Sequence, residues 1–205
     1  MHYFSYFREL DSRVDVIVHQ LEATADNSPM GLCAAARRIF LCDSEEEMFK
    51  ELLSGDEVWF VLDTENVHTD QKRQEQIIQL KEFCEDQNSK GSRVSWSVVQ
   101  SNPCFEVWLC YHKEKSKPLF DGDEECKAWK NYANQLFSGG FSSKKHPLLL
   151  ADAIQNASAN HEEESPGVPS KGCTEVYLCG QSIYSLVKEK LQAIRAQQNI
   201  SSLLK

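Results

Sequence analysis

Two carboxylates close a short apolar segment and carry the clearest chemical signal in the chain. Residues 58–62 are apolar, β-branched and aromatic, as in a buried strand, and Asp63 and Glu65 follow directly. Strand side chains alternate between two faces, so both acids project from one face if the strand continues through Glu65. Two carboxylates on one face suit Mg²⁺ or Mn²⁺, since a hydrated Mg²⁺ ion needs only one or two. The sequence therefore predicts a divalent-metal site at Asp63 and Glu65.

The same acids also fit a structural interpretation. The residues after them are polar, and Asp70 precedes a helix-like run that begins at Gln71. In this interpretation the acids lie in a solvated loop and Asp70 caps the next helix. His68, in the same loop, could contact a phosphate or simply be solvated.

Residues 100–109, Gln-Ser-Asn-Pro-Cys-Phe-Glu-Val-Trp-Leu, indicate a junction between a strand and a helix. Asn102 suits the N-cap, and Pro103 suits the first helical position, where its missing N–H costs nothing. Helix N-termini attract phosphate, so Ser101 and Asn102 are candidate phosphate-binding residues, although capping explains them equally well. Glu106 is either an exposed acid or a catalytic carboxylate. The apolar side chains expected to anchor this helix in the core are Phe105, Trp108 and Leu109.

Two further groups could contribute to a site. Glu22 follows an expected strand over residues 14–21 and could transfer a proton, as could Glu106. The basic triplet at residues 144–146 could touch a nucleic-acid backbone. Alternatively, Glu22 is an acid in a solvated loop, and the triplet lies in a solvated turn.

The apolar spacing predicts helices alternating with strands. Helical spacing occurs over residues 3–10, 30–41, 44–54 and 71–84, and strand-like runs over 14–21, 57–65 and 94–100. This alternation predicts an α/β fold, a Rossmann-like parallel sheet flanked by helices. Ligands bind beyond the carboxyl ends of such strands, where Asp63 and Glu65 would lie. The residues expected in the core include Phe60, Leu62, Val98 and Trp108.

The character of the chain changes after residue 113. Helical patterns dominate from there, at about 123–137, 146–160 and 181–196. Residues 161–172 are rich in proline, glycine and acids, which is typical of a mobile loop or linker. We therefore expect an α/β core over residues 1–115 and a mostly helical region over 116–205, packed on or beside it.

The composition narrows the possible classes of protein. A chain of 205 residues fits one domain, or one domain with a small appendage. Its net charge of −9 opposes a generally nucleic-acid-coating surface but allows a local basic groove. We expect neither a membrane span nor a signal peptide. The eight cysteines are scattered without a C-x-x-C pair, which favours reduced thiols in a cytoplasmic protein over disulfides or a zinc site.

The segment over residues 101–109, preceded by an apolar strand ending in Asp63-x-acid, resembles the RloB-like family of bacterial proteins, which are encoded near restriction–modification and other phage-defence genes. The order of elements over residues 3–113 is similar, and so is Thr-Glu-Val at 174–176. The resemblance implies a Toprim-like fold and a metal-dependent phosphodiester site in which the strand-end acids bind Mg²⁺ or Mn²⁺. Asp63 and Glu65 match that motif, with Glu in place of the usual second Asp.

One part of the implied site has no counterpart in this sequence. Family members usually begin with a strand and a Glu-Gly turn, whose glutamate acts as a general acid or base, before a helix resembling residues 3–10. Because this chain starts at that helix, we expect either a truncated form or the loss of part of the catalytic apparatus.

Two functions are therefore considered. The first is a Mg²⁺-dependent, nuclease-like hydrolase that acts on nucleic acid. The second is a non-catalytic scaffold or protein partner in a defence-associated or restriction-associated complex. In either case a homo-oligomer is possible, because a missing strand would leave a sheet edge open to pairing. A nucleotide-binding Rossmann protein ranks lowest, because the chain has neither a G-x-G-x-x-G nor a Walker-type loop.

Overall fold

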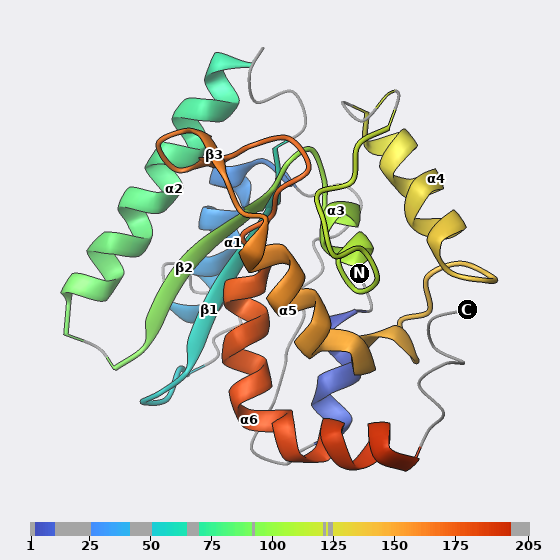
Figure 1. Ribbon diagram of the computed structural model, residues 1–205. Helices are drawn as coiled ribbons and strands as arrows, with labels where there is room; N and C mark the ends of the chain where they lie inside the picture. Colours follow the sequence, from blue (N-terminus) through green and yellow to red (C-terminus); the bar gives the residue numbers. More distant parts are fainter. Residues whose placement is uncertain are drawn as a thin grey trace. The chain divides into compact units, whose positions relative to one another are not determined.

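The computed structural model describes residues 3–10, 26–41, 51–64, 70–91, 93–120, 122 and 125–197 (Figure 1). The chain forms two compact units. One comprises Met1–His19, Asp63–Glu65 and Val99–Lys205, and the other comprises Gln20–Leu62 and Asn66–Val98. The expected domain boundary near residue 115 stays a prediction.

Strands β1 (Glu57–Asp63) and β2 (Ser95–Ser101) form a two-stranded parallel sheet. At the start of the sheet, Ser95 N–H donates to the carbonyl of Asp56, the residue before β1, at 3.1 Å. At its other end, the N–H of Thr64, the residue after β1, donates to the Ser101 carbonyl at 2.9 Å. The prediction of an α/β fold with parallel strands is thereby confirmed. The strand expected over residues 14–21 lies outside the described residues.

Helix α2 (Gln71–Ser89) begins as the sequence predicts. Asp70 is its N-cap, and the Asp70 Oδ1 accepts the N–H of Arg73 at 3.0 Å. This bond satisfies one of the free N–H groups at the helix start. The expected apolar face is confirmed by the burial of Ile77, Leu80 and Cys84, whereas Ile78 is exposed.

Aromatic side chains join two helices of the second unit to strand β2. Helix α1 (Pro29–Phe40) ends in Phe40, whose ring lies 6.0 Å from that of Trp96 on β2. The Phe83 ring, on α2, lies 5.6 Å from the same indole. Helices α1 and α2 also contact each other. Residues 42–50, which hold most of the helix expected over 44–54, are not described, and residues 51–53 are not helical.

Three of the four expected core residues are buried, namely Phe60, Leu62 and Trp108. Val98 is only half-buried, so that prediction is wrong. Val98 lies two residues after the buried Trp96 and shares its face of β2, but the described side chains cover its position only in part. The burial of a strand residue depends on what packs over it, which local pattern does not specify.

The N-terminal segment is helical, as expected, but it forms the tighter 3₁₀ helix η1 (Phe4–Glu9). Tyr3 and Phe7 are buried. The Tyr3 hydroxyl lies 2.8 Å from Nε2 of His112, which is also buried. This segment therefore belongs to the core of its unit.

The C-terminal region is mostly helical, as predicted. Its helices are α4 (Cys126–Leu136), η2 (His146–Leu149), α5 (Leu150–Ala159) and α6 (Val176–Gln197), and α5 and α6 lie side by side (Figure 1). Residues 161–172 were expected to form a mobile loop or linker. They instead contain the antiparallel strands β3 (Glu163–Ser165) and β4 (Val168–Pro169). Long-range hydrogen bonds, described below, hold this hairpin in place.

Gly180 on α6 lies where a side chain would meet closely packed neighbours. An added Cβ would lie 3.2 Å from Trp108 Cη2 and 3.3 Å from Ile154 Cγ1. Gly180→Val should therefore lower the free energy of unfolding by about 1–3 kcal/mol through overpacking. Urea denaturation measures this loss, and a valine variant as stable as the wild type would contradict the close packing.

The cysteines present no disulfide in the described part of the chain. The seven that are described are buried and free, while Cys42 lies outside it. None of the described helices has a stretch that is both long and apolar enough to cross a bilayer.

Candidate functional site

Asp63 lies exposed at the carboxyl end of β1, and the fold fixes its carboxylate there. Its Oδ1 accepts the backbone N–H of Phe105 at 2.8 Å. Phe105 is the N-cap of the short helix α3 (Glu106–Cys110). An ionised carboxylate has about four lone-pair sites, so this hydrogen bond orients the group and still permits a metal ligand.

The start of α3 differs from the prediction. Asn102 was expected to be the N-cap and Pro103 the first helical residue, but α3 starts three residues after Pro103. The polar groups of Asn102 are used elsewhere. Its backbone N–H donates to the Cys173 carbonyl at 3.0 Å, and its Nδ2 donates to the Pro169 carbonyl at 2.8 Å. These tertiary bonds replace the local capping bond.

Ser101 and Asn102, the candidate phosphate-binding residues, are both buried. The Ser101 hydroxyl lies 2.7 Å from the Thr174 hydroxyl. With the Asn102 bonds, this contact attaches residues 169–174 to the end of β2. These polar atoms therefore have a structural role, and phosphate binding by them stays a prediction.

Of the other predicted site residues, the structure describes only Glu106. Glu106 is half-exposed and is the first residue of α3. Glu65, His68 and Glu22 lie outside the described residues, so their predicted roles have no structural description.

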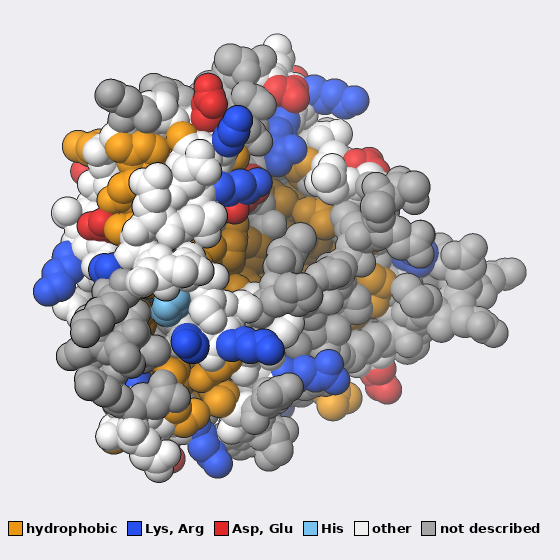
Figure 2. Space-filling model, turned by 90° about the vertical axis from the view of Figure 1, so that its right-hand side faces the viewer, with side chains coloured by type: hydrophobic (Ala, Val, Ile, Leu, Met, Phe, Trp, Pro, Cys, Tyr) orange, Lys and Arg blue, Asp and Glu red, His pale blue; other side chains and the backbone are white. Residues whose placement is uncertain are grey.

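The basic triplet at residues 144–146 does not present three cations. Lys144 and Lys145 are exposed, but His146 is buried, and its Nδ1 accepts the N–H of Ser142 at 2.8 Å. Burial lowers the pKa of His146 to about 4, so this imidazole is neutral at pH 7. On the face shown in Figure 2, lysine and arginine side chains are interspersed with apolar and acidic ones.

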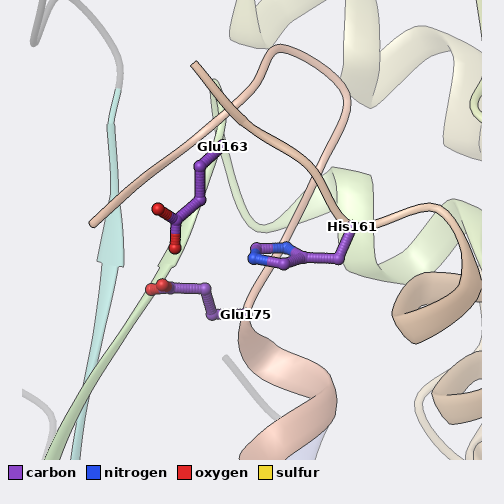
Figure 3. A group of neighbouring side chains, drawn as sticks. All are labelled: His161, Glu163 and Glu175. Atoms are coloured by element: carbon purple, nitrogen blue, oxygen red, sulfur yellow. The ribbon is translucent and has the colours of Figure 1, made fainter. Parts of the chain in front are cut away.

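A second group of possible ligands lies in the C-terminal half. The His–Glu cluster consists of His161, Glu163 and Glu175, whose nearest ligand atoms all lie within 4.8 Å of one another. In Figure 3 the imidazole points toward the two carboxylates. Nitrogen and oxygen donors this close together can share one metal ion after small side-chain movements.

Backbone pairing with β2 positions Glu175. Its N–H donates to the Gln100 carbonyl at 2.7 Å, and its Oε2 accepts the Gln100 N–H at 2.9 Å. The neighbouring residue Thr174 forms an isolated antiparallel bridge with Ser101. Residues 174–175 therefore extend the sheet at the carboxyl end of β2, and this fixes the Glu175 side chain.

The hairpin positions Glu163 in a similar way. Glu163 Oε2 accepts the N–H of Gly167 in the β3–β4 turn at 3.1 Å. The Gly167 carbonyl in turn accepts a hydrogen bond from Nε2 of Gln100 at 2.8 Å. Gln100 therefore connects both carboxylate-bearing segments, since it binds the turn next to Glu163 and the backbone of Glu175.

Sequence reasoning missed the His–Glu cluster because residues 161–172 looked like a linker. Their acids suggested solvation, and His161 and Glu175 are too far apart in sequence to suggest a shared site. The only available signal was the Thr-Glu-Val segment at 174–176, which the resemblance singled out without giving it a role.

The mixed α/β fold with two parallel strands agrees with the fold class predicted from the sequence. The RloB-like protein family matches residues 1–183, so the chain belongs to the RloB-like family. No curated protein and no solved structure matched the chain.

Proposed function

We propose that this protein is a divalent-metal-dependent phosphodiester hydrolase of Toprim type that acts on nucleic acid in bacterial phage defence. The observation that carries this proposal is the placement of Asp63. Its exposed carboxylate lies at the carboxyl end of a parallel strand and is oriented by the Phe105 N–H. Ligands bind at this position in open α/β sheets.

The donor set fits a hard cation. Asp63 supplies a carboxylate oxygen, and Glu65 supplies the second in the match to the family motif. Bound Mg²⁺ or Mn²⁺ polarises a phosphate and activates a water molecule. Glu106 begins α3 directly after Phe105, the residue that binds Asp63. Glu106 is thus the neighbour in sequence of the residue that orients Asp63, and in this proposal it serves as the proton-transfer group.

Asp63→Asn should abolish the response to Mg²⁺ and Mn²⁺ and leave the fold intact. The asparagine keeps an oxygen that can accept the Phe105 N–H, but it loses the charge that binds the cation. For the wild type, Mn²⁺ at 100 times its dissociation constant should add about 2.7 kcal/mol to the free energy of unfolding. Calorimetric titration and thermal melts measure the two effects.

The matched control is Glu82→Gln, which removes one negative charge from an exposed position on α2. This variant should bind and respond to Mn²⁺ like the wild type. If the wild type shows no binding at millimolar Mg²⁺ or Mn²⁺, or if Asp63→Asn binds equally well, the metal site is refuted.

Cleavage of labelled single-stranded DNA, double-stranded DNA and RNA in Mn²⁺ tests the activity itself. The hydrolase proposal expects cleavage of at least one substrate by the wild type and none by Asp63→Asn. Metal binding without any cleavage would instead favour the non-catalytic scaffold, which binds a partner in a defence complex.

A further inference from the structure

We infer that His161, Glu163 and Glu175 form a binding site for Zn²⁺. The inference does not depend on the activity proposed for Asp63, because it uses none of the same residues. It rests on the geometry of the three side chains, on their donor types, and on unsatisfied polar atoms at and beside them.

The geometry requires little rearrangement. Ligands about 2.1 Å from a tetrahedral ion lie about 3.4 Å from one another. The three donor atoms here all lie within 4.8 Å of one another, so side-chain movements on the order of 1 Å close the site. Glu163 is exposed on the hairpin, whereas His161 and Glu175 are half-buried, so one side of the site remains open to solvent.

The donor types select the class of ion. Magnesium and calcium prefer oxygen ligands only, whereas an imidazole favours zinc and other transition metals. One histidine with two carboxylates is a set of three protein ligands, and zinc sites with three protein ligands keep a position for water or substrate. The cluster therefore favours Zn²⁺ over Mg²⁺ and Mn²⁺, which suit carboxylate and water ligands.

Two buried polar atoms at this place have no partner in the described structure. One is Nδ1 of His161, and the other is Oε1 of Gln100, whose side chain is fully buried. The Gln100 amide adjoins the cluster, because its Nε2 lies 3.5 Å from Glu175 Oε2. Buried polar groups are normally hydrogen-bonded, and each exception needs an explanation. A bound ion with its water supplies partners that protein atoms do not.

A bound ion would join three segments that are separate in the sequence. His161 follows α5, Glu163 lies on β3, and Glu175 directly precedes α6. Metal binding should therefore stabilise the attachment of the hairpin to the end of β2, which Gln100 maintains through Gly167 and Glu175.

The test uses the whole 205-residue chain, stripped of metal by a chelator and titrated with Co²⁺ as a spectroscopic substitute for Zn²⁺. Nitrogen and oxygen ligands give only weak visible bands, whereas thiolate ligands add strong near-ultraviolet absorption. We expect weak visible bands that disappear when Zn²⁺ displaces the bound Co²⁺. His161→Ala should weaken Co²⁺ binding by at least about tenfold. Glu163→Gln should weaken it too, and this exposed hairpin position keeps the test valid if His161→Ala fails to fold.

The matched control is Glu164→Gln, on the same hairpin but outside the cluster, and it should bind Co²⁺ as the wild type does. All three variants should retain the Asp63-dependent response to Mn²⁺ at its own affinity, so a failure of one site is distinguishable from a failure of the other. No Co²⁺ binding, strong thiolate absorption, or binding unchanged in both His161→Ala and Glu163→Gln would overturn the inference.

Discussion

Trp108→Ala should lower the free energy of unfolding by about 3–5 kcal/mol, the range for removing a large aromatic side chain from a core. Trp108 is fully buried in α3. Its ring lies 6.1 Å from that of Tyr3 and 5.2 Å from that of His112, both edge-to-face. Its Cη2 also limits the space at Gly180. The substitution therefore leaves a cavity bordered by three segments of the chain.

Packing, rather than hydrogen bonding, accounts for this loss. The indole Nε1 of Trp108 has no hydrogen-bond partner in the described structure, so the substitution removes no such bond. Trp108→Phe should consequently recover much of the stability, because it restores part of the aromatic contact. Chemical denaturation of both variants makes the comparison, and a Trp108→Ala loss below about 1 kcal/mol would contradict the packing described.

Acidification from pH 7 to pH 5 should destabilise the protein through His112. This imidazole is buried, and burial lowers its pKa to about 3 from the ordinary 6.5. Its Nδ1 lies 3.1 Å from the Trp108 carbonyl, which only accepts, so Nδ1 carries the proton. Nε2 then accepts the hydroxyl proton of Tyr3 at 2.8 Å. The folded state therefore holds a neutral imidazole with both nitrogens satisfied.

The sign of the pH effect follows from the two pKa values. Above pH 6.5 the imidazole is neutral in both states and its contribution is flat. Between pH 6.5 and about pH 3 the unfolded chain binds a proton that the folded state does not, so stability falls as the pH falls. At 1.36 kcal/mol per pH unit, the loss by pH 5 is about 2 kcal/mol.

The pH dependence of urea denaturation in wild type and His112→Gln isolates this contribution. Glutamine supplies a donor and an acceptor but does not titrate in this range. The carboxyl groups titrate in both proteins, so the difference between the two stability profiles reports the titration of His112. Parallel profiles between pH 7 and pH 5 would show that His112 does not titrate as its burial requires.

The sequence by itself determined the features that depend on neighbours in the chain. The apolar runs predicted β1 and β2 and their parallel pairing, and helical spacing predicted α2 and the helical C-terminal region. Asp70 was identifiable as an N-cap because its partner, the N–H of Arg73, is three residues away. Residue type and short-range periodicity suffice for such features, since the interacting groups are fixed by local geometry.

Only the tertiary structure decided which polar groups meet. Asp63 binds the N–H of Phe105, 42 residues later, and Glu175 binds the backbone of Gln100, 75 residues earlier. Asn102 suited a local cap, but its amide binds the Pro169 carbonyl instead. The same long-range pairing ordered the hairpin after α5 and brought His161 beside two carboxylates. Periodicity shows which face of an element is apolar, but the contact between distant segments depends on how whole elements pack, so the His–Glu cluster emerged only in three dimensions.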